Sequence, residues 1–134
     1  MINAIISKFF GTAHERHIKQ FDPILAQIND LGSEYSQIDD IELVNKTQEF
    51  KRRLQEGETL DSLRAEAFAV CREACDRRLR IFNVFNETHE FDCKRLDAEH
   101  EALYLGALKD IQDGVPEWEI HLPASFYQEI RNLY

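Results

Sequence analysis

Residues 59–82, TLDSLRAEAFAVCREACDRRLRIF, decide the fold class because they carry the clearest helical pattern in the chain. Thr59 is placed to cap a helix, and no glycine or proline interrupts the run that follows. Apolar residues recur at helical spacing, which predicts an inward-facing stripe of Leu63, Ala67, Val70, Cys71, Ala74 and Cys75. We therefore predict an amphipathic helix from Thr59 to about Phe82.

The residues before this helix predict three more helices. Asp39 and Glu42 have the spacing of a capping box, which predicts a helix from about 39 to Gly57. A helix over 14–31 is expected to kink or restart at Pro23 and to end at Gly32. The first ten residues predict a short amphipathic helix that ends at Gly11.

The residues after it complete an all-α fold. A helix is predicted over about 88–113, stopped by Gly114 and Pro116. Residues 118–122 alternate in polarity and suggest a short extended segment, and Ser125 with Gln128 has the spacing of a capping box for a last helix. The predicted fold is a small helical domain of about five to six helices with one extended segment near the carboxyl end.

Composition narrows the function classes. A chain of 134 residues has room for one domain, and its formal charge of -9 disfavours binding to nucleic acid. Because no apolar run is long enough to span a bilayer and no export signal precedes the first helix, we expect a cytoplasmic protein. Three cysteines without an export signal indicate reduced thiols and no disulfide framework. No cofactor is indicated.

The middle of the chain resembles a known family. The runs KTQEFKRRL (46–54), GETLD (57–61) and EAFAVCREA (66–74) are similar to the amino-terminal region of SecA, the bacterial preprotein translocase motor. The resemblance covers roughly residues 1–80. It implies a helical region that packs, in that family, against a large nucleotide-binding domain. The phosphate-binding loop GxxxxGK[ST] that the family carries has no counterpart in this sequence, so we expect neither ATP hydrolysis nor another enzyme activity.

The carboxyl-terminal part differs from this region in charge. Residues 1–82 hold 12 basic and 14 acidic side chains, whereas residues 83–134 hold 4 and 11. Helices that lack their usual partner domain would expose apolar faces, and the acidic tail is rich in apolar residues. We therefore expect 1–134 to be a single domain in which residues 83–134 pack on the SecA-like helices of 1–82. The residues expected to do so are Phe91, Leu96, Leu103, Leu105, Leu108, Ile111, Trp118, Ile120, Leu122, Phe126 and Ile130.

One candidate contact site lies in the first predicted helix. Its apolar face is large for its length and could contact a membrane, the translocation channel or a partner protein. Lys8 is the only basic residue within it, which favours docking onto the protein's own core or a second copy over lipid contact. The candidate contact residues are Ile2, Ile5, Ile6, Phe9 and Phe10.

Metal sites are weaker candidates. Cys71 and Cys75 could form a zinc site with His89, Cys93 and His100. For the first two, a role as small buried thiols in the core is the stronger interpretation. His14 and His17 lack a third ligand. Trp118 could fill a partner's groove, although a core position is favoured.

The predicted function is that of a non-catalytic protein-binding module: a protein-secretion accessory or degenerate translocase paralogue. Its expected partners are SecA, the translocation channel or another copy of itself, with peripheral contact at the inner membrane left open. The alternatives are a helical adaptor unrelated to secretion and a small zinc-binding helical protein.

Overall fold

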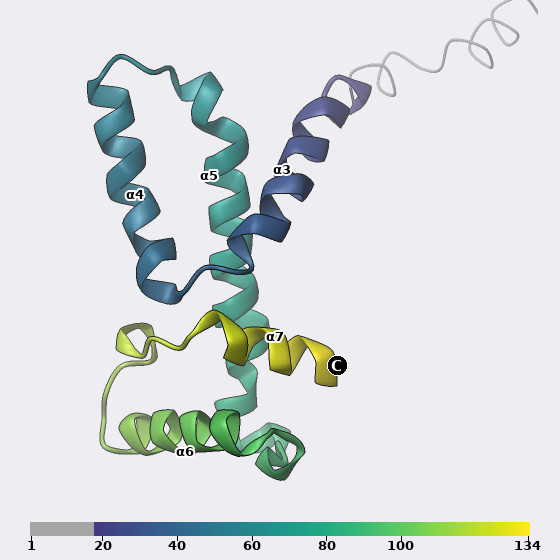
Figure 1. Cartoon of the computed structure of the whole chain (residues 1–134), viewed down its shortest axis with the longest axis vertical. Helices are drawn as coiled ribbons and strands as arrows, with labels where there is room; N and C mark the ends of the chain where they lie inside the picture. Colours follow the sequence, from purple (N-terminus) through teal and green to yellow (C-terminus); the bar gives the residue numbers. More distant parts are fainter. Residues whose placement is uncertain (1–17) are drawn as a thin grey trace, which may run out of the picture.

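The computed structural model describes residues 18–134 and is built from helices (Figure 1). No strand occurs within this range, which confirms the all-α prediction. The predicted helix over 1–10, its five candidate contact residues, His14 and His17 lie outside the described residues. With the labels of Figure 1, the α-helices are α3 (Asp22–Tyr35), α4 (Asp40–Gln55), α5 (Leu60–Cys75), α6 (Ala98–Gln112) and α7 (Ala124–Leu133).

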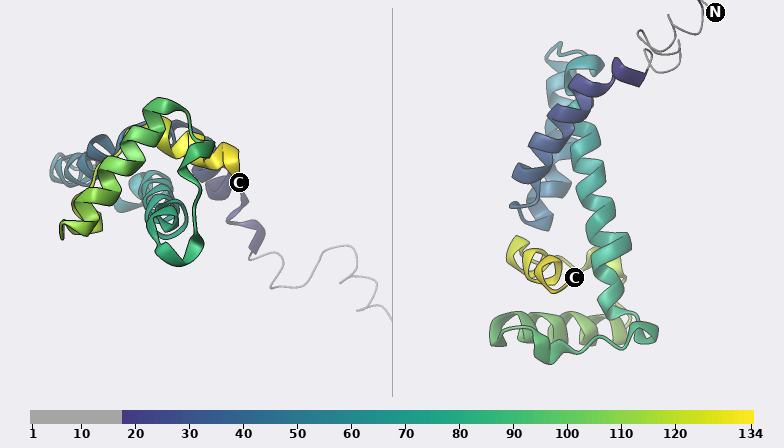
Figure 2. Two further views of the ribbon diagram at one scale, coloured as in Figure 1. Left: turned by 90° about the horizontal axis from the view of Figure 1, so that it is seen from below. Right: turned by 90° about the vertical axis from the view of Figure 1, so that its right-hand side faces the viewer.

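One long helical rod connects an upper and a lower lobe. It begins with α5, passes into a π-helical segment, η1 (Asp76–Arg80), and ends in a 3-10 segment, η2 (Ile81–Phe85). Helices α3 and α4 lie beside the upper part of the rod. Figure 2 shows α6 lying across the lower end, with α7 between it and the upper helices.

The two lobes have separate apolar cores. The upper core is small and centres on Tyr35, Leu43 and Ala69. The lower core is larger and joins η2 to α6, α7 and the segment before α7. Its buried members are Ile81, Phe82, Val84, Phe85, Leu96, Tyr104, Ala107, Ile120, Leu122, Phe126, Tyr127 and Ile130. The tail therefore packs its apolar side chains mainly against Ile81–Phe85 and against itself.

The start of α5 follows the prediction, because its signals are local. The Thr59 side chain accepts a hydrogen bond from the Ser62 amide at 3.2 Å, which satisfies one of the free donors at the helix start. Gly57, just before it, has a φ of 97°, a conformation that a residue without a side chain adopts readily. The predicted inward-facing stripe of this helix was partly wrong, because three of its members, Ala67, Cys71 and Cys75, are exposed. Ala67 and Cys71 border an open space between α5 and α4, and Cys75 is the last residue of α5.

The predicted end of α3 at Gly32 was wrong, because the helix continues to Tyr35. Gly32 is needed there for a close approach: a Cβ atom would lie 1.9 Å from a guanidinium nitrogen of Arg72. That guanidinium donates to the Asn29 side chain at 2.8 Å and to the Ile28 carbonyl at 2.9 Å. Gly32 thus lets α5 anchor α3 through Arg72.

The helix predicted from residue 88 begins ten residues later, at Ala98. Asn86 and Asp92 each cap a short 3-10 turn, η3 (Glu87–His89) and η4 (Cys93–Arg95), so the chain turns twice before α6. Asp97 then caps α6 by accepting from the amides of Glu99 at 3.0 Å and His100 at 2.9 Å. Asx side chains stop and restart helices in this way because they compete with the backbone for donors.

The last helix is present, but its predicted capping box is wrong. Helix α7 begins at Ala124, after Pro123, and no side chain of its own first turn caps it. Ser125 is exposed. Before α7, a 3-10 turn, η5 (Glu117–Glu119), leads into an extended stretch that ends at Pro123.

Two apolar tail residues expected in the core are exposed. Trp118 is 72% exposed and Leu105 is 49% exposed. Arg78 donates to the carbonyls of Glu117 at 2.7 Å and Ile120 at 2.9 Å, and so holds the backbone of this turn against the rod while the indole remains in solvent. None of the helices within residues 18–134 is long and apolar enough to cross a bilayer.

Candidate protein-binding site

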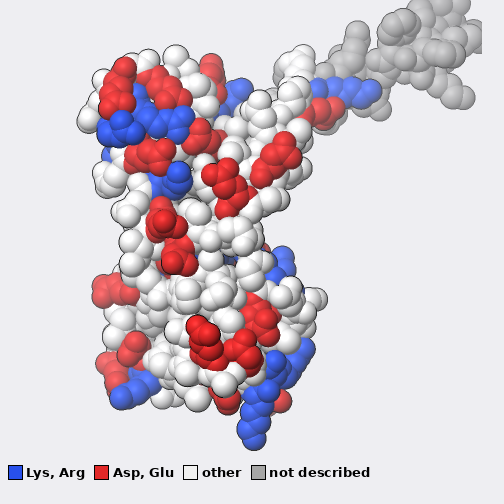
Figure 3. Space-filling model, viewed as in Figure 1, with Lys and Arg blue, Asp and Glu red and all other residues white. Residues whose placement is uncertain are grey.

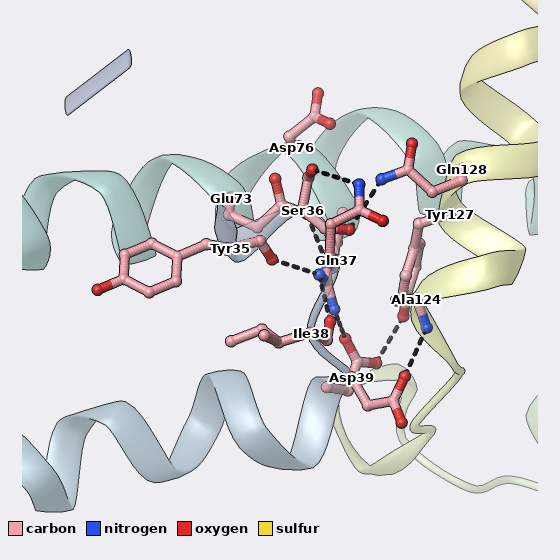
Figure 4. A network of polar contacts seen from close by, with 12 residues as sticks. Tyr35, Ser36, Gln37, Ile38, Asp39, Glu73, Asp76, Ala124, Tyr127 and Gln128 are labelled. Carbon is pink, nitrogen blue, oxygen red and sulfur yellow. Dashed lines mark hydrogen bonds and ion pairs between the residues drawn. The ribbon is translucent and has the colours of Figure 1, made fainter. Parts of the chain in front are cut away.

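A buried arginine stands where the two lobes meet. Arg77, in η1, has no exposed surface, and its guanidinium donates to Asp40 at 2.9 Å and to Glu73 at 2.7 Å. It also donates to the carbonyls of Tyr35 at 3.1 Å and Ile38 at 2.7 Å (Figure 4). A buried guanidinium is tolerated only when its charge and its donors are satisfied, and both conditions are met here.

Asp40 extends this network into the tail. One of its oxygens accepts from the Tyr127 hydroxyl at 2.5 Å and from the Leu122 amide at 3.1 Å. Arg78 donates to the same oxygen at 3.2 Å. Burial, together with the Asp40 carboxylate, raises the pKa of Tyr127 far above its ordinary value, so the hydroxyl stays protonated and donates.

Asp39 also joins the upper lobe to the tail, and the prediction that it caps α4 was wrong. Its carboxylate makes no capping bond to α4; instead, it accepts from the Ala124 amide at 2.7 Å, at the start of α7. Gln128 donates to the Ser36 carbonyl at 2.8 Å (Figure 4). Arg131 donates to Glu73 at 2.7 Å and to Asp76 at 2.8 Å. The contact between α7 and the upper lobe is therefore largely polar.

A groove between α4 and α5 is the best candidate for binding a partner. It has a volume of about 410 Å³ and runs along the upper lobe. Val44, on its α4 wall, is 61% exposed, and the neighbouring Ile41 is 60% exposed. Exposed apolar side chains that gather along one surface often mark a protein contact. The groove is lined by Asp40, Leu43, Val44, Thr47, Phe50, Ala67, Val70, Cys71, Ala74 and Arg78.

Two arginines at the tip of the α4–α5 hairpin are paired with acidic side chains. Figure 3 shows basic side chains at this tip flanked by acidic ones. Arg53 contacts Glu58 and Glu66, each at 2.7 Å, and Arg52 contacts Glu56 at 2.7 Å. Hydrogen bonds from Arg53 are the main reason that the pKa of Glu58 lies below its ordinary value. The charges of these two arginines are therefore largely compensated within the hairpin.

The residues considered for zinc do not come together. Cys71 and Cys75 are exposed on α5, whereas His89 and Cys93 lie in separate 3-10 turns. The ring of His100 contacts Asp97 at 2.8 Å. Among residues 18–134, no group of three or more His, Cys, Asp or Glu side chains could hold a metal ion.

The sequence interpretation missed Asp40, Arg77 and Tyr127 as a group. The spacing of Glu73 and Arg77, four residues apart on the side of the helix that carries Ala69, was the only local signal. Tyr127 lies 87 positions from its partner Asp40, so no short-range pattern connects them.

These features define a small helical protein with an apolar groove and with an ionic centre, formed by Arg77, Asp40, Glu73 and Tyr127. The family model described as the SecA DEAD-like domain matches residues 6–93, and the chain belongs to that family. The match continues beyond residue 80, where the resemblance seen in the sequence ended.

Curated relatives are considerably longer. The protein translocase subunit SecA of Geotalea uraniireducens is 53% identical over 86 residues, which are 63% of this chain and 10% of the relative. The protein translocase subunit SecA of Ralstonia pickettii is 49% identical over 86 residues, or 63% of this chain and 9% of the relative. The chain thus spans about a tenth of the length of these relatives. No solved structure matches it.

Proposed function

We propose that this chain is a non-catalytic protein-binding module of the SecA family that binds a component of the protein-translocation machinery. The observation that carries the proposal is the apolar groove between α4 and α5, which no other described element covers. The groove lies within the part of the chain that matches the family. Because the sequence contains no GxxxxGK[ST] loop, binding is a better-supported role than nucleotide hydrolysis.

We further propose that the lobes act as one unit at the cytoplasmic side of the membrane. The ionic centre supports the single unit, since Asp39 and Asp40 contact the tail directly. The position at the membrane is proposed from the family alone. SecA itself is the first partner to test, followed by the translocation channel and a second copy of this chain. The apolar residues of the first predicted helix, Ile2 to Phe10, remain a prediction for a second contact.

The test is a binding titration between the fluorescently labelled full chain and purified SecA, followed by anisotropy. Val44→Asp places a carboxylate in the groove, where binding would bury it without a partner. We expect the dissociation constant to rise about tenfold or more, as for a residue at the centre of an interface. Leu105→Asp is the matched control, because Leu105 is an exposed leucine on α6, outside the family match.

The possible results separate the alternatives. If Val44→Asp and Leu105→Asp weakened binding to SecA equally, the groove would be excluded as the binding site. If the chain bound neither SecA nor the channel nor a second copy, the proposed role in protein translocation would be contradicted. Binding through the groove to a protein unrelated to secretion would favour the adaptor alternative.

A further inference from the structure

Cys71 and Cys75 form a pair of thiols in the last turns of α5. Both are exposed, although sequence periodicity predicts that they face inward. They lie one turn apart on a continuous helix, where Cβ atoms are about 5–6 Å from each other. Neither residue is needed for a core, so packing does not account for two cysteines at these positions.

The two thiols lie near enough for each to influence the ionisation of the other. The pKa of the Cys75 thiol is raised above its ordinary value, with a hydrogen bond to Cys71 as the largest cause. The helix holds both sulfurs on one side, and Cys71 borders the apolar groove between α4 and α5. The helix backbone thus fixes the spacing of the two residues.

We propose that Cys71 and Cys75 together bind one Cu(I) ion. The proposal does not rest on the partner-binding role, although Cys71 also lines the groove assigned to it. Thiolates are soft ligands and select soft ions such as Cu(I). A closed zinc site needs four ligands, and no third His, Cys, Asp or Glu joins this pair among residues 18–134. Cu(I) accepts two thiolates as a complete ligand set. Binding would release the two thiol protons, and the copper would keep its oxidation state.

The experiment uses the reduced full chain, without oxygen, and Cu(I) supplied as its bicinchoninate complex. We expect the chain to withdraw one copper ion, which the loss of the complex's absorbance would report. Cys71→Ser and Cys75→Ser should each weaken binding about tenfold or more, because each removes one of two ligands. Cys93→Ser is the matched control, since Cys93 lies in η4 and contacts Glu101 at 3.8 Å, and it should bind as the wild type does.

Two further measurements make the outcome decisive. X-ray absorption at the copper edge should show two sulfur neighbours and no nitrogen, and circular dichroism should show that the serine variants remain folded. Full binding by the Cys71→Ser/Cys75→Ser double variant would overturn the proposal. So would failure of the wild type to withdraw copper, or a requirement for Cys93. One copper per two chains in a dimer would also overturn it.

Discussion

Arg77 is the residue on which the centre of the molecule depends. It is fully buried and compensates the charges of Asp40 and Glu73. Its guanidinium also lies over the Tyr127 ring, 4.6 Å from the ring centroid. Removing one member of a buried ion network leaves the others uncompensated, which costs more than the network contributes.

We predict that Arg77→Met lowers the free energy of unfolding by about 3–5 kcal/mol, because it removes the buried cation that Asp40 and Glu73 share. The two carboxylates would keep only Arg78 and Arg131, which are partly exposed. Urea denaturation followed by circular dichroism at 222 nm would measure the change. Arg80→Met is the control: this side chain is 68% exposed and pairs with Asp76 at 3.3 Å. An exposed pair should contribute less than about 1 kcal/mol. Similar losses in the two variants would contradict the role given to Arg77.

At the scale of elements, Asp39 stabilises a helix other than the one that it precedes. It stands before α4, yet its carboxylate accepts from the first amide of α7. The backbone donors at the start of α7 have no capping side chain from their own segment. The sequence-distant carboxylate therefore supplies the cap.

Asp39→Ala should therefore weaken α7 and leave α4 largely unchanged. We expect a loss of about 1 kcal/mol, a usual value for a lost cap. Amide hydrogen exchange would locate it as faster exchange in the first turn of α7. Glu42→Ala, which removes the other member of the predicted capping box, should leave exchange in both helices unchanged. Faster exchange in α4 after Asp39→Ala would support the sequence-based interpretation instead.

Sequence patterns predicted the elements whose signals are local and missed the contacts between distant residues. The positions of α4 and α5 followed from local signals such as Thr59 and Gly57, which act within one turn. Gly32 was misinterpreted because the reason for it is Arg72, forty positions away. The ionic centre was missed for the same reason: Tyr127 meets Asp40 only after the tail has folded back.

At the scale of the whole molecule, two cores share one rod. Residues 81–85 belong to the rod, but their side chains form part of the lower core. The family match ends at residue 93, so it includes this apolar segment without α6 and α7, which cover it. The matched segment alone would therefore expose four large apolar side chains: Ile81, Phe82, Val84 and Phe85.

We predict that a chain ending at Cys93 binds the dye ANS strongly and aggregates, because these side chains lose their cover. A chain ending at Arg80 lacks them and should bind less dye per molecule. Both truncations lose the same contacts from α7 to Asp39 and Asp40, so their difference reports the 81–93 segment alone. Equal dye binding by the two would show that the upper lobe, and not η2, carries the exposed surface.

The position of Trp118 has a practical consequence. As the only tryptophan, it supplies most of the intrinsic fluorescence of the chain, and it already stands in water in the folded protein. Its emission will change little when the protein unfolds. For the same reason, a shift to shorter wavelength on mixing with a tryptophan-free ligand would mean that something has covered the η5 turn.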